Sequence, residues 1–495
     1  MNLARLVESA GLGASGPLGR WSDAPVTGFA IDHRKVAPGT VFGAFQGLTV
    51  NGEDFVPAAV AAGAVAVVAR GEVPVEGAAH LADPQPRRTF ARLAAQFFRP
   101  VPRVVVAVTG TNGKTSTVEM ARQIWRLMGE RAASIGTLGV TTPDESVSTG
   151  LTSPDIVTFL ANMTGLAREG VTHVAYEASS HGLSQFRSEG LPVAAAAFTN
   201  LSRDHLDYHA DMEDYFAAKM RLFTEVVDGS GTAVVWADDG WSARVLDVAR
   251  ARGLRVLTVG EAGEDIRLLS RTPGQLGQEL VVAYDGAEHR VMLPLIGAYQ
   301  AANALVAAGL VLATGGEAAA VFDALSRLQL VRGRLELAAI AAAGVPVYVD
   351  FAHTTDALGA AIDALRPHLA VGGRMIVVFG AGGDRDPGKR TAMGQIVAGR
   401  AEIVIVTDDN PRGEDPAAIR DQVMAGAPGA RSIGDRREAI QVAIAEAREG
   451  DIVLIAGKGH EQGQIVGTGE AARVLPFDDV GTVREFAAEQ AGERA

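Results

Sequence analysis

A short glycine-rich segment in the first quarter of the chain carries the residue types that hold nucleotide phosphates. Its residues are Gly110, Thr111, Asn112, Gly113, Lys114, Thr115 and Ser116. In loops of this kind, glycines let backbone N–H groups approach the phosphates, a lysine reaches the β- and γ-oxygens, and a threonine hydroxyl ligates Mg²⁺. The common G-x-x-x-x-G-K-[ST] spacing is not kept, because Val108 stands where its first glycine would be. We predict a shorter phosphate loop for ATP and Mg²⁺, since a plain glycine turn would not need Lys-Thr at a helix start. The loop alone is compatible with a kinase, an ATPase or a ligase.

A carboxylate and an imidazole follow two later strand-like runs. Glu177 ends the run at residues 172–177, and His205 follows the run at residues 194–199. Open α/β sheets bind ligands at the carboxyl ends of their strands, so both side chains would lie near the phosphate loop if the strands are neighbours. Glu177 is therefore a candidate metal ligand. Because Mg²⁺ prefers oxygen ligands, spacing alone favours a structural role for the Asp204–His205 pair over metal binding.

Two polar turns in the last quarter of the chain contain arginines that a turn does not require. Residues 382–386 include Arg385, and residues 409–412 end in Arg412. Gly, Asp, Asn and Pro favour turns for local reasons, so a pair of ordinary turns is one interpretation. A guanidinium group, however, binds a carboxylate through two parallel hydrogen bonds. The arginines favour a ligand such as a diamino diacid, which has one carboxylate more than lysine.

Apolar, β-branched runs that alternate with helix-compatible stretches must position these polar segments. The predicted strands are residues 103–109, 172–177, 194–199 and 232–236 in the middle of the chain, and 346–351, 374–379, 402–407 and 451–456 nearer its end. A helix is predicted at residues 114–128, directly after the phosphate loop. This alternation is typical of parallel sheets covered by helices. We predict an α/β protein with a central parallel sheet domain that contains the phosphate loop and a C-terminal Rossmann-like α/β domain.

The chain is too long for one hydrophobic core. Single cores stop growing near roughly 250–300 residues, whereas this chain has 495. The first hundred residues contain short apolar runs, such as residues 64–69, that fit a small α/β module. Prolines within residues 98–103, and glycine and arginines within residues 331–334, indicate changes of element. We predict three domains, at residues 1–100, 101–332 and 333–495.

The composition excludes several classes of protein. The formal net charge of −13 would repel a nucleic acid over most of the surface, so phosphate must be bound at a local site. Without cysteine, the chain has no disulfide, thiolate nucleophile or Cys-ligated zinc. We expect no secretory signal, and the most apolar run, residues 58–69, is shorter than the ~20 residues that span a bilayer. We expect a cytoplasmic monomer that acts on small molecules and has no nucleic-acid partner.

The motifs around the predicted nucleotide site resemble the central domain of the Mur ligases, in particular the tripeptide-forming branch. The matching segments are residues 110–115, 177–183 and 199–209, together with Lys219. The resemblance implies that Lys219 carries a carbamate that helps hold a second Mg²⁺. It also implies a set of metal ligands that comprises Thr115, Glu177, His205 and Lys219.

The same resemblance extends to the rest of the nucleotide site. Asn303 matches the adenine contact of the family, while Gln300 replaces a second asparagine. Arg334 matches a basic residue that approaches the nucleotide when the domains close. The implied catalytic residues are Lys114, His205, Lys219 and Arg334.

The resemblance also implies where the UDP-linked muramoyl peptide binds. The N-terminal domain would bind UDP, with His33 where the family usually has serine and residues 48–50 in place of a more polar uridine-contacting segment. Hydrogen-bonding side chains of the central domain would bind the peptide part. The implied contacts are His33, Thr152, Ser153, Ser179, Gln185 and Arg187.

In the third domain, the Asp-Asn-Pro-Arg sequence at residues 409–412 is the family's mark of members that add meso-diaminopimelate. Lysine-adding relatives differ at the position of Arg412. Residues 350–358 resemble another family segment, with Phe351 for tyrosine and Thr355 for proline. The implied pocket for the amino acid comprises Arg385, Asp409, Asn410, Pro411, Arg412, Gly457 and Glu461.

The resemblance therefore implies an ATP-dependent ligase that adds meso-diaminopimelate to UDP-N-acetylmuramoyl-L-alanyl-D-glutamate through an acyl phosphate. Two alternatives are retained. Within the same class, the chain could add lysine or act as a folate or poly-amino-acid ligase. Arg412 is evidence against these alternatives. From another class, the phosphate loop could serve a nucleotide-driven switch or a partner-binding ATPase, a reading that leaves Lys219 and the third-domain pocket unexplained.

Overall fold

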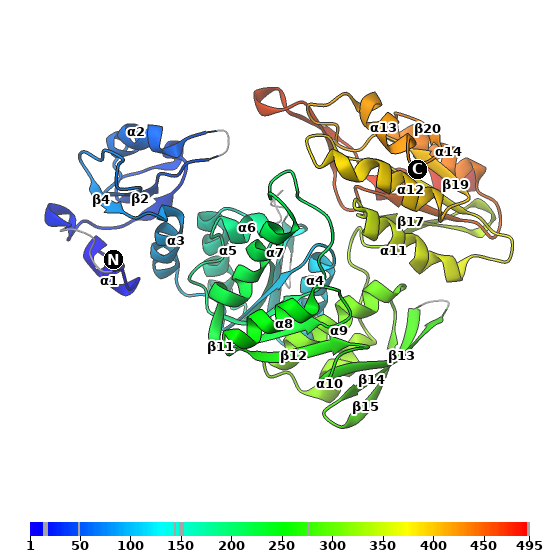
Figure 1. Cartoon of the computed structure of the whole chain (residues 1–495), viewed down its shortest axis with the longest axis horizontal. Coiled ribbons are helices and arrows are strands. Elements are labelled where there is room, and N and C mark those ends of the chain that lie inside the picture. Colours follow the sequence, from blue (N-terminus) through cyan, green and yellow to red (C-terminus); the bar gives the residue numbers. More distant parts are fainter. Residues whose placement is uncertain (13–17, 48–49, 143–144, 148–152, 275–276, 493–495) are drawn as a thin grey trace.

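The computed structural model describes residues 1–12, 18–47, 50–142, 145–147, 153–274 and 277–492. Three groups of strands and helices follow one another along the chain, and each has its own main sheet (Figure 1). The predicted α/β fold class is confirmed. Three of the expected substrate positions, Leu48, Thr49 and Thr152, lie outside the described residues.

The N-terminal sheet has four parallel strands in the order β1-β2-β3-β4. Its elements are α1 (Leu3–Ser9), β1 (Gly28–Ala30), β2 (Thr40–Gly43), α2 (Val56–Ala61), β3 (Ala66–Ala69), β4 (Ala79–Ala82) and α3 (Pro86–Phe97). Pro86 suits the first turn of α3, because an N–H there would have no partner within the helix. Phe90 and Leu93 of α3 are fully buried in a cluster that also contains Phe159 of the central group. Helix α3 thus packs the N-terminal sheet against its neighbour.

The central sheet has eleven strands in the order β15-β14-β13-β12-β11-β10-β5-β9-β6-β7-β8. The strands are β5 (Val104–Thr109), β6 (Ala132–Gly136), β7 (Gly139–Thr141), β8 (Ser146–Val147), β9 (His173–Glu177), β10 (Val193–Phe198), β11 (Val227–Trp236), β12 (Arg255–Gly260), β13 (Ile266–Gly274), β14 (Gly277–Tyr284) and β15 (Ala287–Leu293). The helices are α4 (Lys114–Leu127), α5 (Ile156–Arg168), α6 (Ser180–Ser184), α7 (Met212–Arg221), α8 (Ser242–Ala251), α9 (Ala298–Ala313) and α10 (Ala318–Leu325).

Strands β5, β9, β10 and β11 match the four predicted strands, whereas β6, β12 and the antiparallel edge strands were not predicted. Strands β12, β11, β10, β5, β9 and β6 run parallel. Antiparallel pairs β13–β14 and β14–β15 extend one edge, and β6–β7 and β7–β8 extend the other. The edge strands were not predicted, because their exposed faces interrupt the apolar runs that identify buried parallel strands.

The C-terminal sheet has six strands in the order β16-β17-β21-β18-β19-β20, with β16 antiparallel to β17. The strands are β16 (Glu336–Ala341), β17 (Val345–Asp350), β18 (Met375–Phe379), β19 (Ile403–Val406), β20 (Arg431–Ser432) and β21 (Ile452–Ala456), and β22 (Gly463–Val466) and β23 (Arg473–Pro476) form a separate pair. The helices are α11 (Thr355–Leu365), α12 (Arg390–Ala398), α13 (Pro416–Met424), α14 (Arg436–Glu446) and α15 (Asp479–Ala491). All four strands predicted in this region are present.

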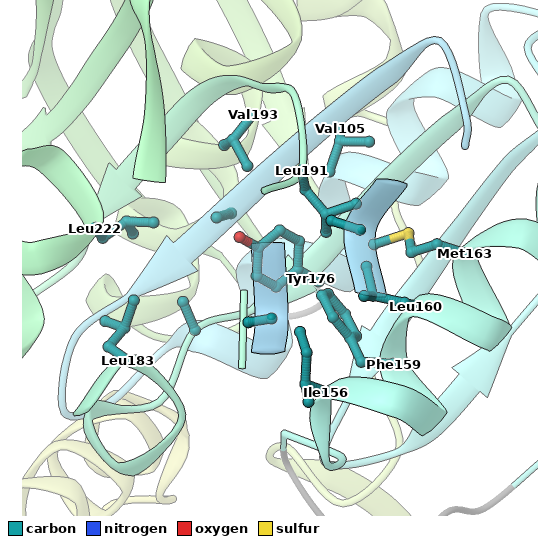
Figure 2. Packing of buried hydrophobic residues seen from close by; sticks show 14 of the residues in the cluster. Val105, Ile156, Phe159, Leu160, Met163, Tyr176, Leu183, Leu191, Val193 and Leu222 are labelled. Carbon is teal, nitrogen blue, oxygen red and sulfur yellow. The ribbon is translucent and has the colours of Figure 1, made fainter. Parts of the chain in front are cut away.

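Aromatic and aliphatic side chains between the central sheet and α5 hold β9 in place. Figure 2 shows Tyr176 of β9 beside Phe159 and Leu160 of α5, and the rings of Tyr176 and Phe159 lie 5.0 Å apart. Full burial of each such side chain contributes roughly 1.5–3 kcal/mol. This packing fixes the carboxyl end of β9, where Glu177 lies. Within the described part of the chain, no helix combines the length and apolarity needed to cross a bilayer.

Candidate active site

The phosphate loop lies between β5 and α4, and two glycines make its path possible. Gly110 and Gly113 have φ angles of +147° and +87°, which residues with a Cβ rarely adopt. A Cβ at Gly110 would lie 2.0 Å from Oγ1 of Thr199, and one at Gly113 would lie 2.3 Å from Oδ1 of Asn303. The loop is therefore packed against the end of β10 on one side and α9 on the other. This places Asn303, the predicted adenine contact, beside the loop.

The residues after β10 hold the loop by direct hydrogen bonds. The Asn112 carbonyl accepts from Oγ1 of Thr199 at 2.6 Å and from Nδ2 of Asn200 at 3.1 Å. The Asn112 N–H donates to Oδ1 of Asn200 at 2.9 Å. Neither Thr199 nor Asn200 was predicted as a site residue. The close approach of β5 and β10 explains their role, since the two strands are neighbours in the sheet.

Two lysines meet at the carbonyl of Gly110. Nζ of Lys114 donates to the Gly110 and Thr111 carbonyls at 2.9 and 2.7 Å, and Nζ of Lys219 donates to the Gly110 carbonyl at 2.7 Å. Lys219 is only 1% exposed and lies 4.4 Å above the ring of Tyr215. Burial, together with the nearby charge of Lys114, lowers the pKa of Lys219 well below its ordinary value. Lys219 is thus a buried amine whose surroundings disfavour its charged form.

The predicted carboxylate and imidazole lie at the same edge of the sheet. Glu177 is 3% exposed, and its carboxylate accepts from the Thr137 N–H at 2.7 Å. His205 has a φ of +55°, and its Nε2 lies 3.6 Å from Oδ2 of Asp204. Burial lowers the pKa of His205 to about 3, so the ring is neutral at physiological pH. A neutral imidazole is the form that binds metal ions.

The donor set suits a metal ion only in part. Thr115 and Glu177 offer the oxygen atoms that Mg²⁺ prefers, and His205 offers a neutral nitrogen. Within the ranges described above, no three His, Asp or Glu side chains converge closely enough to form a metal site by themselves. A further oxygen ligand would have to come from a substrate, from water or from a modified Lys219.

Arg334 reaches the phosphate loop from the segment that leads into the C-terminal sheet. Its Nη2 donates to Oγ1 of Thr115 at 2.9 Å, and its guanidinium lies 4.4 Å above the ring of Phe351. The backbone around Arg334 is fixed by Asp350, which accepts from the N–H groups of Leu335 and Ala352 at 2.6 and 2.7 Å. Burial raises the pKa of Asp350 to about 6. The C-terminal part of the chain therefore supplies a cation to the nucleotide loop.

Four of the residues expected to bind the muramoyl peptide lie together. Oγ of Ser153 lies 3.0 Å from Oγ of Ser179 and donates to the Glu177 carbonyl at 3.2 Å. Arg187 donates to the Ser153 carbonyl at 2.5 Å and to Oε1 of Gln185 at 2.8 Å. Ser153, Glu177 and Arg187 also line a small cavity. The structure thus brings these four predicted side chains together next to Glu177.

His33 lies apart from these residues, in the N-terminal group. Its ring stacks on Phe55 with 4.3 Å between centroids and 3° between planes. Burial also lowers the pKa of Arg87, at the start of α3, whose guanidinium packs on Phe45 and donates to the Gln46 carbonyl at 2.8 Å. Arg87 was not predicted as a site residue.

Three of the residues expected to bind the amino acid, Asp409, Asn410 and Glu461, contact Lys458, which is fully buried. Nζ of Lys458 donates to Oδ1 of Asn410 at 2.8 Å and lies 3.4 Å from Asp409 and 3.6 Å from Glu461. Nδ2 of Asn410 donates to Glu461 at 2.9 Å. Gly457 has a φ of +118°, and a Cβ there would lie 3.1 Å from Oδ2 of Asp409. Lys458 was missed from the sequence, because nothing in its neighbours indicates that a lysine is buried.

Arg412 lies close to this acidic cluster, and Arg385, which pairs with Asp207 at 3.7 Å, lies close to Arg412. Arg412 follows Pro411, has a φ of +50°, and donates from Nη1 to the Gly383 carbonyl at 2.8 Å. Burial and the nearby charge of Arg385 lower the pKa of Arg412. On the other side, burial and Asp409 raise the pKa of Glu461. The pocket thus combines two guanidinium groups with two carboxyl groups, which complements a ligand that carries a carboxylate and an ammonium.

Comparisons with known proteins agree over nearly the whole chain. Three family models match: "Mur ligase family, catalytic domain" at residues 25–98, "Mur ligase middle domain" at residues 108–311, and "Mur ligase, glutamate ligase domain" at residues 333–459. The UDP-N-acetylmuramoyl-L-alanyl-D-glutamate--2,6-diaminopimelate ligase of Zymomonas mobilis subsp. mobilis is 59% identical over 463 residues, which cover 94% of this chain and 95% of that protein.

Two further comparisons agree with the first. The ligase of the same name from Bradyrhizobium diazoefficiens is 51% identical over 460 residues, which cover 92% of this chain and 93% of that protein. A solved structure of a ligase with this name has a TM-score of 0.69 and 32% identity, and covers 98% of this chain and 99% of its own.

Proposed function

Because the chain belongs to the Mur ligase family, we propose that it is an ATP-dependent amide-bond ligase that adds meso-diaminopimelate to UDP-N-acetylmuramoyl-L-alanyl-D-glutamate. The reaction would form the tripeptide precursor of peptidoglycan and release ADP and phosphate. We also propose that residues 1–100 bind UDP, 101–332 bind ATP and 333–495 bind the amino acid. The contact between Arg334 and Thr115 carries the proposal, because it joins a nucleotide loop to the part of the chain that contains the amino-acid pocket.

The proposed reaction consists of two successive nucleophilic substitutions, the first at phosphorus and the second at carbon. A carboxylate oxygen of the D-glutamyl group attacks the γ-phosphorus of ATP, the bond to ADP breaks, and an acyl phosphate forms. The amine of diaminopimelate then attacks the carbonyl carbon, and phosphate leaves. Lys114 and Arg334 would neutralise charge on the transferring phosphoryl group, since both cations lie at the loop. Ser116 and Asn303 would complete the contacts to ATP.

Thr115, Glu177, His205 and a carboxylated Lys219 are the residues that would hold Mg²⁺. When bound, this ion supplies positive charge to the phosphate oxygens. Lys219 can become such a ligand only if its Nζ attacks carbon dioxide and loses a proton, which requires the neutral amine. The lowered pKa of Lys219 supports this modification, because burial and Lys114 both favour the neutral form. The product is a carbamate with the oxygen ligands that the metal prefers.

The charge pattern of the third-domain pocket supports the choice of amino acid. Arg385 and Arg412 would bind the carboxylate at the end of diaminopimelate that does not react, while Asp409 and Glu461 would face its ammonium. Burial acts to raise the pKa of Asp409, but Lys458 and Arg436 outweigh burial and lower it, so this carboxylate stays ionised. Lysine has no carboxylate at that end and would leave the remaining N–H donors of Arg412 without an acceptor.

The test is phosphate release from ATP and Mg²⁺ in the presence of the UDP-muramoyl dipeptide, with meso-diaminopimelate or L-lysine as the amine. Release that requires both the dipeptide and diaminopimelate is expected. Release with lysine instead would contradict the assignment of the amino acid and keep the ligase. Release that is indifferent to both substrates would contradict the ligase assignment and favour a nucleotide-driven switch.

A further inference from the structure

Two polar loops from different sheets meet through three pairs of opposite charges. One loop, residues 202–207, follows β10 of the central sheet, and the other, residues 384–389, follows β18 of the C-terminal sheet. Nε of Arg203 lies 3.0 Å from Oδ2 of Asp386, and its Nη2 lies 3.4 Å from Oδ1. The other two pairs are Lys389–Asp204 at 3.3 Å and Arg385–Asp207 at 3.7 Å.

Two of these pairs contain an almost fully buried carboxylate, although the Arg203 side chain itself is 58% exposed. The side chains of Lys389 and Asp204 are 8% and 9% exposed, and that of Asp386 is 8% exposed. Asp386 is also fixed by its own loop, since its Oδ1 accepts from the Gly388 N–H at 2.8 Å. A charge that is removed from water needs its partner, so separating the loops would leave the buried carboxylates of Asp204 and Asp386 without their cations. In the third pair, Arg385–Asp207, both side chains are partly exposed, so water screens their attraction and this pair contributes less.

Each loop is in turn fastened to one half of the active site. Oγ1 of Thr111, in the phosphate loop, accepts from the Ser202 N–H at 3.0 Å and lies 3.1 Å from the Ser202 carbonyl. At the other end, the Gly383 carbonyl accepts from Nη1 of Arg412 at 2.8 Å. Hydrogen bonds, ion pairs and the short backbone segments between them therefore connect the phosphate loop to the amino-acid pocket.

We propose that Arg203, Asp386, Asp204 and Lys389 are positioning residues that hold the amino-acid pocket in register with the phosphate loop. The inference rests on the proposed function, because it concerns how the acyl phosphate is used. With the loops docked, the amine nitrogen forms the C–N bond, the C–O bond to phosphate breaks, and the amine proton leaves to solvent. With the loops out of register, water attacks the same carbon, regenerates the carboxylate and releases phosphate. ATP would then be consumed without product.

The ratio of tripeptide formed to ADP formed measures this register directly. Arg203→Glu places like charges opposite each other at Asp386. We expect the ratio, close to one in the unaltered protein, to fall by roughly fivefold, the effect of losing one such pair. The KM for diaminopimelate should rise by a similar factor, while the KM for ATP should stay within twofold. Adding Asp386→Arg to Arg203→Glu restores opposite charges and should recover at least half of the ratio.

Two further variants separate positioning from folding. Arg290→Glu disrupts an exposed ion pair between β15 and β14, in which Arg290 lies 3.4 Å from Glu279. This variant should leave the ratio unchanged. Asp386→Asn keeps an acceptor for the Gly388 N–H and should still lower the ratio, so a folding defect of the charge swap would not hide the effect. If the unaltered protein forms about one tripeptide per ADP and the ratio is unchanged in both Arg203→Glu and Asp386→Asn, the positioning role alone would be overturned. An unaltered protein that forms no tripeptide would overturn the proposed function as well.

Discussion

Removing the guanidinium of Arg412 should reduce the use of diaminopimelate far more than the use of lysine. One of its nitrogens, Nη1, is occupied by the Gly383 carbonyl at 2.8 Å, which leaves the others to bind a carboxylate. A hydrogen bond to a charged group contributes about 1.5–3 kcal/mol. Two such bonds, partly offset by relief of repulsion from Arg385, amount to about 3 kcal/mol. At about 1.4 kcal/mol for each factor of ten, Arg412→Ala should lower kcat/KM for diaminopimelate by about a hundredfold.

The assay is steady-state tripeptide formation with each amine, at saturating ATP and dipeptide. Because lysine lacks the second carboxylate, its kcat/KM should change by less than about threefold. Arg437→Ala removes an exposed arginine of α14 that pairs with Glu485 of α15, and it serves as the matched control. An equal loss for both amines in Arg412→Ala would show that Arg412 supports the loop rather than recognises the carboxylate, and would refute the reasoning.

Three other predictions follow from buried groups. Lys219→Ala should abolish tripeptide formation, and a short carboxylic acid added to the buffer should restore part of it; no rescue at any concentration would contradict the carbamate. Phe159→Ala should lower the free energy of unfolding by about 3–5 kcal/mol in denaturant titrations, whereas Val371→Ala, at a fully exposed position, should change it by less than about 0.5 kcal/mol. Burial raises the pKa of Asp350 to about 6, so between about pH 4 and 6 the folded protein binds one proton more than the unfolded chain. A rise in pH through that window should therefore lower the free energy of unfolding by up to ~3 kcal/mol. Asp350→Asn should lack this dependence, and parallel pH curves for the two proteins would show that the raised pKa is wrong.

The sequence predicted the parts of the fold that follow from buried parallel strands. Residues 104–108 and 194–198 are continuous apolar runs, because both faces of these strands are covered by helices. The hairpins formed by β13, β14 and β15 were not predicted, because one face of these strands is exposed. Their outward faces carry polar residues such as Arg267, so the pattern resembles a loop unless the pairing partner is known.

The candidate site was predictable only where a motif fixes geometry locally. Glycines at 110 and 113 require a tight loop, and Lys114 must follow at the helix start. The role of Lys219 depended on resemblance alone, because burial against Gly110 joins residues that are more than a hundred positions apart. Lys389 and Lys458 show the same limit, since a lysine in a polar turn resembles a solvated residue until the opposing carboxylates are in place.

The division of the site among separate sheets has a chemical reason. An acyl phosphate reacts readily with water, so a site that formed it before the amine arrived would consume ATP without product. Here the phosphate loop belongs to one sheet, the amino-acid pocket belongs to another, and Arg334 contacts Thr115 across the two. The same docking brings Lys389 to Asp204, beside His205. Capture of the amine therefore depends on the docking of the two sheets, and loss of the ion pairs between their loops should divert the acyl phosphate to water.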